Sequence, residues 1–183
     1  HKLVTDALEM LINMEHRGAC GCEPNSGDGA GILVQVPHEF FKRKLSEKGK
    51  ELPEKGKYGV GMMFLPEEKQ LLARCLYLFE DYADEMGFDL IHYRKVPTDH
   101  EELGPTSKSV EPRFQQVFVQ PREELDPKAL ERKLFVLRKH ATHMIHMTYP
   151  ETRDQFYLAS FSYKTIVYKG QLTTWQLPGY YHD

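Results

Sequence analysis

The chain has 183 residues, of which 40% are hydrophobic and 28% are charged, a balance typical of one water-soluble domain with a hydrophobic core. The formal net charge of −3, without a basic stripe, argues against nucleic acid and anionic membranes as partners, and no apolar run approaches the roughly 20 residues of a membrane helix. The three cysteines are odd in number, which argues against a disulfide framework and for a reducing compartment.

The first third of the chain predicts two helices and one strand. Thr5 suits the N-cap of a helix whose apolar residues recur at helical spacing, and Asp6 follows in its first turn. A short run of β-branched residues then predicts a buried strand, which Pro37 ends. The expected elements are a helix over residues 5–15, a strand over 32–36, a helix over 39–45 anchored by Phe40 and Phe41, and a charged loop over 46–57.

The middle of the chain shows the order strand–helix–strand twice. Gly87 stops the first of the two helices, and Pro127 begins the second. The expected strands cover residues 58–65, 88–96, 114–119 and 156–162, and the expected helices cover 66–86 and the segment after 127. This β-α-β-β-α-β order predicts a ferredoxin-like subdomain over residues 58–161, inserted into a larger sandwich.

The end of the chain returns to that larger sandwich. Residues 164–170 alternate between two faces and predict a strand that shares a sheet with residues 32–36. Residues 171–183, which contain a tryptophan, a proline and two tyrosines, are expected to be irregular.

Residues 14–31 hold five glycines and one proline between an expected helix and an expected strand. Glycine loses more conformational entropy on folding than any other residue, so this cluster indicates positive φ angles or the close approach of another group. A phosphate-binding loop is disfavoured, because such loops follow a strand and open a helix, whereas this stretch precedes a strand. A purely structural loop is the remaining alternative.

The same stretch resembles a known enzyme family. His16-Arg17-Gly18, followed by Asp28 and Gly31, is similar to the His-Arg-Gly … Asp-x-x-Gly pattern of class II glutamine amidotransferases. Residues 5–32 as a whole resemble the start of the glutaminase domain of the glutamate synthase large chain. Similar segments follow at residues 96–98, 103–105, 111–112, 116–119 and 164–170, so the resemblance covers nearly the whole chain.

The resemblance implies a fold and a reaction. The fold is α+β, part of the αββα sandwich of N-terminal-nucleophile hydrolases, with the β-α-β-β-α-β subdomain inserted. The reaction is hydrolysis of the glutamine side-chain amide to glutamate and ammonia. In the family, a cysteine at the mature N-terminus attacks the amide carbon, its own α-amino group serves as base, and an oxyanion hole stabilises the tetrahedral intermediate.

The resemblance also places the main catalytic groups of the family outside this sequence. The nucleophilic cysteine lies shortly before the match to His1, and the groups that hold glutamine lie beyond the match to Gly170. We therefore expect no catalytic residue in this chain and no glutaminase activity of the chain alone. Its expected role is to support the glutamine pocket, and the residues expected to do so are Arg17, Gly27, Asp28 and Gly29.

For the complete enzyme, the resemblance implies that the ammonia aminates 2-oxoglutarate. FMN, an iron–sulfur cluster and a nicotinamide or ferredoxin electron donor are then implied for other domains, and no cofactor for this chain. Glutamine and the remaining domains of glutamate synthase are the expected partners, in the cytoplasm or in the plastid of a plant. The chain lacks an initial Met and ends abruptly, which is typical of part of a longer protein. The alternative function is a non-catalytic binding or interaction module that keeps the amidotransferase fold.

The remaining cysteine and histidine patterns do not favour a metal site. Cys20 and Cys22 lack the second pair that a zinc or iron–sulfur site requires. His140, His143 and His146 step by three along an expected helix, which spreads them around its surface, and no carboxylate lies nearby at metal spacing.

His16 and Arg17 also have structural interpretations. We expect His16 to be buried and hydrogen-bonded rather than to act as a base. Arg17 is placed where it could form a salt bridge at the end of the preceding helix, as an alternative to a role in the pocket.

Overall fold

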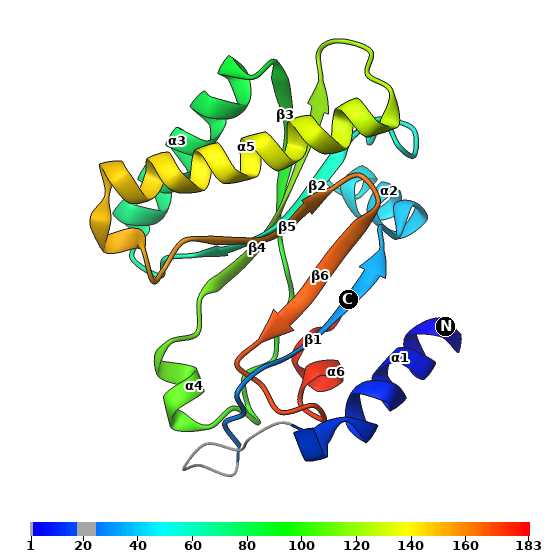
Figure 1. The fold of residues 1–183 in the computed structure, drawn as a ribbon, viewed down its shortest axis with the longest axis vertical. Coiled ribbons are helices and arrows are strands. Elements are labelled where there is room, and N and C mark those ends of the chain that lie inside the picture. The colour runs from blue at the N-terminus through cyan, green and yellow to red at the C-terminus, as the bar shows by residue number, and fades with distance from the viewer. Residues whose placement is uncertain (1, 18–24) are drawn as a thin grey trace. The chain divides into compact units, whose positions relative to one another are not determined.

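The computed structural model describes residues 2–17 and 25–183, and Figure 1 shows their helices and strands. The chain folds into two units. Unit 1 consists of His1–Val34, Val96–Glu111 and Val167–Asp183, and unit 2 consists of Gln35–Lys95 and Pro112–Ile166. Unit 1 is therefore assembled from three segments that are far apart in the sequence.

Unit 2 is built on a four-stranded antiparallel sheet and two long helices. In chain order, these strands and long helices are β2 (Gly59–Leu65), α3 (Lys69–Glu85), β3 (Phe88–Lys95), β4 (Arg113–Pro121), α5 (Pro127–Thr148) and β5 (Tyr157–Ser162). The strand order in the sheet is β3-β4-β2-β5, so β2 pairs on both sides and is a central strand. The strands and helices follow the doubled strand–helix–strand order that the sequence predicts.

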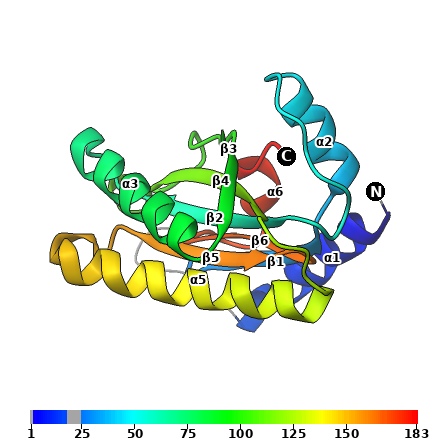
Figure 2. The same ribbon diagram turned by 90° about the horizontal axis from the view of Figure 1, so that it is seen from above.

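The core of unit 2 lies between this sheet and the helices α3 and α5, which Figure 2 shows from above. Leu71, Cys75, Phe79 and Ala83 are the buried residues of α3, and their spacing of four places them on one face of the helix. The buried residues of α5 that join the same core are Leu130, Leu134, Leu137, Ala141 and Ile145. The apolar residues that recur at helical spacing in the sequence are therefore the residues that pack in this core.

Carboxylate side chains cap both helices. Glu68 accepts hydrogen bonds from the backbone amides of Gln70 and Leu71, and Asp126 accepts from those of Lys128 and Ala129. The helix that the sequence predicts from residue 66 therefore begins three residues later, at Lys69, because Glu68 satisfies the first free amides.

The second face of the sheet receives the short helix α2 (His38–Ser46). Phe41 from α2 is fully buried and meets Phe118 of β4 edge to face, with ring centroids 5.1 Å apart. Phe40 is only partly buried, so Phe41 is the main anchor of the two. Tyr58 also packs beside Phe118, with a centroid separation of 6.3 Å.

Unit 1 contains helices and most of a two-stranded sheet. Its elements are α1 (Lys2–Asn13), the short helix η1 (Glu15–Arg17), β1 (Ala30–Gln35), α4 (Pro105–Ser109), β6 (Thr165–Gly170) and α6 (Leu177–Tyr180). β1 pairs with β6, which confirms the predicted common sheet. A bridge between Thr98 and Tyr181 joins the segment before α4 to the segment after α6.

Some predicted boundaries are wrong. α1 begins at Lys2, so Thr5 lies inside the helix and is not its N-cap. α6 lies in residues 171–183, which were expected to be irregular, and α4 lies between two expected strands, where the sequence predicts no helix. Each is too short to show a helical period, and a proline in the first turn is its one helix signal. No helix in the described part of the chain is long and apolar enough to cross a membrane.

Candidate functional site

The glycine stretch that the sequence singles out lies in unit 1, directly before β1. Gly29 has a φ of 136°, a conformation that L side chains rarely adopt, so the expectation of a glycine with positive φ is confirmed. At Gly27 and Gly31, by contrast, glycine is required because a side chain would have no room. A Cβ on Gly27 would lie 2.5 Å from the Leu172 carbonyl oxygen, and one on Gly31 would lie 2.5 Å from the Lys169 Cβ.

The backbone at the start of the stretch is held by two other segments of unit 1. The carbonyl oxygen of Asn25 accepts hydrogen bonds from the Gly104 amide at 3.0 Å and from Gln176 Nε2 at 3.1 Å. Gln176 Nε2 also donates to the Glu102 carbonyl at 2.8 Å, and Gln176 Oε1 accepts from the Thr173 amide at 2.9 Å. One side-chain amide therefore joins three segments.

A pair of buried serines adds a second connection. Ser107 Oγ lies 3.3 Å from Ser26 Oγ and donates to the Gln171 carbonyl oxygen at 3.1 Å. Ser107 comes from α4, Ser26 from the glycine stretch and Gln171 from the turn after β6. The serines thus connect the same three segments as Gln176 does.

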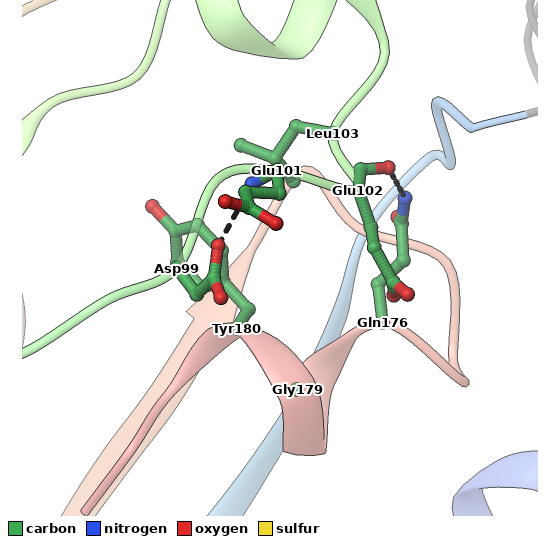
Figure 3. Close-up of a pocket in the computed structure, with 7 residues that line it drawn as sticks. All are labelled: Asp99, Glu101, Glu102, Leu103, Gln176, Gly179 and Tyr180. Atoms are coloured by element: carbon green, nitrogen blue, oxygen red, sulfur yellow. Dashed lines mark hydrogen bonds between the residues drawn. The ribbon is translucent and has the colours of Figure 1, made fainter.

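A hollow of about 170 Å³ opens beside Gln176 (Figure 3). Its lining residues are Asp99, Glu101, Glu102, Leu103, Gln176, Gly179 and Tyr180. The volume is below the roughly 300–1,000 Å³ of ordinary ligand pockets. Three acidic side chains line it, so it does not suit the α-carboxylate of glutamine.

Tyr180 lines this hollow, and Tyr181 follows it in the chain; both tyrosines are buried. The Tyr180 hydroxyl donates to Glu111 Oε1 at 2.6 Å, and the Tyr181 hydroxyl donates to the Lys169 carbonyl at 2.8 Å. Burial and the hydrogen bond to Glu111 raise the pKa of Tyr180, and burial and the neighbouring Tyr168 raise the pKa of Tyr181. Both therefore stay protonated near neutral pH and act as hydrogen-bond donors rather than as bases.

Three of the four predicted support residues follow one another in the sequence. Gly27, Asp28 and Gly29 are consecutive, and Asp28 is exposed. We expect the Asp28 carboxylate to accept a hydrogen bond from a backbone amide of its own loop. Arg17 is the last residue of η1, and the interpretations of its side chain stay predictions as well. Cys20 and Cys22 lie outside the described residues.

The predicted histidines do not form one shared site among the described residues. His16 is exposed, so the expectation that it is buried is wrong, although its Nδ1 lies 2.9 Å from the Asn13 carbonyl oxygen. His140 packs edge to face on Tyr82, while His146 Nε2 lies 3.0 Å from the Phe156 carbonyl. Over residues 2–17 and 25–183, no three histidine, cysteine or carboxylate side chains are grouped to hold a metal ion.

The sequence did not predict Ser107 and Gln176, which contact the glycine stretch, or Tyr180, which lines the hollow. Each lies in a segment without helical or strand periodicity. A weak signal was available for Gln176, since it is an amide between the apolar residues Trp175 and Leu177. Only the fold reveals its partners.

Comparison with known proteins identifies the family. The model of the family described as "Glutamine amidotransferases class-II" matches residues 1–183. The chain therefore belongs to the class II glutamine amidotransferases.

Individual relatives specify which class II amidotransferases the chain is similar to. Over its whole length the chain is 41% identical to glutamate synthase [NADH] of Saccharomyces cerevisiae, 38% to the glutamate synthase [NADPH] large chain of Bacillus subtilis, and 37% to ferredoxin-dependent glutamate synthase of Pyropia yezoensis. The resemblance to the glutaminase domain of glutamate synthase is thereby confirmed. The chain spans 9% of the yeast relative's length and 12% of the other two.

Proposed function

We propose that this chain is part of the glutaminase domain of a glutamate synthase, in which glutamine is hydrolysed to glutamate and ammonia and the ammonia aminates 2-oxoglutarate. The observation that carries the proposal is the match over the full chain to glutamate synthases that differ in electron donor. A match that persists across NADH-, NADPH- and ferredoxin-dependent proteins points to the part of the reaction that they share.

Within this function, the glycine stretch supports the glutamine pocket. Gly27 brings the stretch against the segment after β6, and Gly29 gives it a turn that other residues rarely make. Arg17 and Asp28 are the other two residues of the proposed support. The stretch has the character of a scaffold, because its described contacts are those of the Asn25 carbonyl, the Gly27 backbone and the buried Ser26 hydroxyl.

The proposed fold is an αββα sandwich to which β1 and β6 contribute two strands. Residues 58–161 form the inserted ferredoxin-like subdomain in this proposal, supported by the strand order β3-β4-β2-β5. The rest of the sandwich would come from the remaining glutaminase sequence of the complete enzyme.

FMN and the iron–sulfur cluster belong to other domains in this proposal. Among the described residues of this chain, Cys75 is the one thiol, and it is buried in the core of unit 2. Besides Cys75 the sequence has two cysteines, too few for a cluster that is held by four thiolates. The glycine stretch precedes a strand instead of opening a helix, which does not fit the phosphate of FMN. The remaining domains are the proposed partners, in the cytoplasm or a plastid.

We further propose that the 183-residue chain alone does not release ammonia from glutamine. The thiol that the structure describes, Cys75, is buried, and burial raises its pKa to about 11, so it cannot serve as the nucleophile near neutral pH. Ammonia release from glutamine by the purified chain, measured against a buffer blank and a mock purification, should stay at background. Release above both controls would contradict the proposal.

The test of the function uses the full-length protein that contains this chain. Glutamate formation from 2-oxoglutarate is measured with either glutamine or ammonia as nitrogen source. The Gly29→Val variant should lose glutamine-dependent activity and keep ammonia-dependent activity, because ammonia bypasses the pocket. Gly49→Val is the matched control, since Gly49 also has positive φ but lies in unit 2 with open space around it.

Each other outcome points to a different conclusion. If both activities fell together in a protein that remains folded by circular dichroism, the stretch would not act on the pocket locally. If neither fell, the stretch would be an ordinary loop. If the unmodified protein formed glutamate from neither nitrogen source, the chain would be the non-catalytic module considered as the alternative.

A further inference from the structure

Gln176 lies at the junction of the three segments of unit 1 and is buried, with 2% of its surface exposed. Its side chain makes three hydrogen bonds, two through Nε2 to the carbonyls of Asn25 and Glu102 and one through Oε1 from the Thr173 amide. Figure 3 shows the bond to Glu102 on the wall of the acidic hollow. A side-chain amide has two donor hydrogens, and both are used here.

These bonds join residues that are distant in the sequence. Asn25 precedes Gln176 by 151 residues and Glu102 precedes it by 74. Asn25 belongs to the glycine stretch and lies two positions before Gly27, where the stretch approaches the backbone of Leu172. The position of the stretch therefore depends on an amide that lies outside it.

We propose that Gln176 is a positioning residue for the use of glutamine: its amide holds the Asn25 carbonyl, and through it the glycine stretch, in the place that the pocket requires. This inference rests on the proposed function. Gln176 acts through Asn25 and makes no contact with substrate in this role. A displacement of about 1 Å in a group that positions substrate can cost on the order of a hundredfold in rate.

The most informative variant is Gln176→Glu in the full-length protein. The side chain keeps its size, but a carboxylate offers no hydrogen to the carbonyls of Asn25 and Glu102 and instead places negative charge against both oxygens. Gln176→Leu removes the hydrogen bonds without adding charge. The control is Gln155→Glu, because the Gln155 amide also donates to a backbone carbonyl, that of Glu151 at 3.0 Å, but is exposed.

The response to pH separates positioning from a general loss of structure. The introduced carboxyl would be buried and would face two carbonyl oxygens, and the titratable groups lining the adjoining hollow are Asp99, Glu101, Glu102 and Tyr180. Burial and negative neighbours favour the neutral acid, so the pKa of this carboxyl would be raised above its usual value. As the pH falls through that raised pKa, the carboxyl gains a proton and donates one hydrogen bond again.

We expect Q176E at about pH 8 to lower kcat/KM for glutamine by about tenfold or more while ammonia-dependent activity stays within about twofold of the unmodified enzyme. At about pH 6, relative to the unmodified enzyme at the same pH, Q176E should recover most of this loss and Q176L should recover none. Q155E should match the unmodified enzyme at both values.

The inference is overturned if Q176E leaves the kinetics with glutamine unchanged, or if it lowers both activities equally at both pH values. Loss of folding in both variants, measured by circular dichroism, would likewise assign Gln176 to general stability and overturn a positioning role. Absence of glutamine-dependent activity in the unmodified protein would instead refute the proposed function itself. The two failures are therefore distinguishable.

Discussion

Gly27 lies so close to Leu172 that a Cβ on Gly27 would stand 2.5 Å from the Leu172 carbonyl oxygen. The next nearest atoms are also backbone, the Leu172 carbonyl carbon at 2.7 Å and the Thr173 amide nitrogen at 2.8 Å. Backbone atoms cannot turn aside as the end of a flexible side chain can. The separation between the glycine stretch and the segment after β6 is therefore set by the absence of a side chain at one position.

Gly27→Ala should destabilise the chain by about 3 kcal/mol, at the upper end of the cost of overpacking a well-packed site. The free energy of unfolding is measured in urea by the fluorescence of Trp175, the single tryptophan of the sequence, which lies in unit 1. Gly179→Ala is the control, since its Cβ would meet only Glu102 Oε2, at 3.9 Å. Equal stabilities for the two variants would contradict the close contact at Gly27.

Ser107→Ala and Ser109→Ala form a matched pair on α4. Ser107 is buried and its hydroxyl connects to Ser26 and the Gln171 carbonyl, while Ser109 is exposed and bonds to the Thr106 carbonyl one turn back. Loss of the buried hydroxyl should cost about 1–2 kcal/mol, and loss of the exposed one less than about 0.5 kcal/mol. Thermal unfolding would reveal the difference, and a larger effect at Ser109 would argue against the buried connection.

Asp126→Ala should shorten or fray the start of α5. The carboxylate oxygen Oδ1 accepts from the backbone amides of Lys128 at 2.8 Å and Ala129 at 3.0 Å, so its removal leaves both donors to water. The expected loss of stability is about 1 kcal/mol. Hydrogen exchange at Lys128 and Ala129 should accelerate while exchange in α3 is unchanged. Protection that persists at both amides would show that the cap is dispensable.

Cys75 should resist alkylation in the folded chain. Burial raises the pKa of its thiol to about 11, and the negative charge of Glu151 adds to the shift. At pH 8 only about one thiol in a thousand would then be thiolate, the reactive form, and this fraction grows as the pH rises toward 11. Peptide mapping after brief iodoacetamide treatment should find Cys75 unmodified in buffer and modified in urea. Equal modification in both would contradict its burial.

Regular periodicity carried most of the information that the sequence offered about the fold. The apolar spacing of Leu71, Cys75 and Phe79 predicted α3, because a helix of this length must bury one continuous face. The glycine cluster predicted a backbone with positive φ, which Gly29 has. Both signals are local, so they can be read without knowledge of distant residues.

The residues that hold the candidate site were not predictable in this way. Gln176 bonds to Asn25 and Glu102, neither of which is near it in the sequence. The amide is also an ordinary polar residue in a segment without a period, so nothing local distinguishes it from an exposed glutamine such as Gln155. The error at His16 has a related cause, because the turn after α1 decides its exposure and the residue type does not.

The bond between Gln176 and Asn25 also sets an order of events during synthesis. The ribosome adds 151 residues between these two positions, which takes roughly 8–30 s at typical rates of translation. Both segments of unit 2 emerge within that interval, so unit 2 can complete its core first. Until the last segment of unit 1 has been synthesised, the Asn25 carbonyl lacks its hydrogen bond from Gln176. Substitutions that remove this hydrogen bond are therefore expected to lower the yield of correctly folded protein in cells as well as its activity.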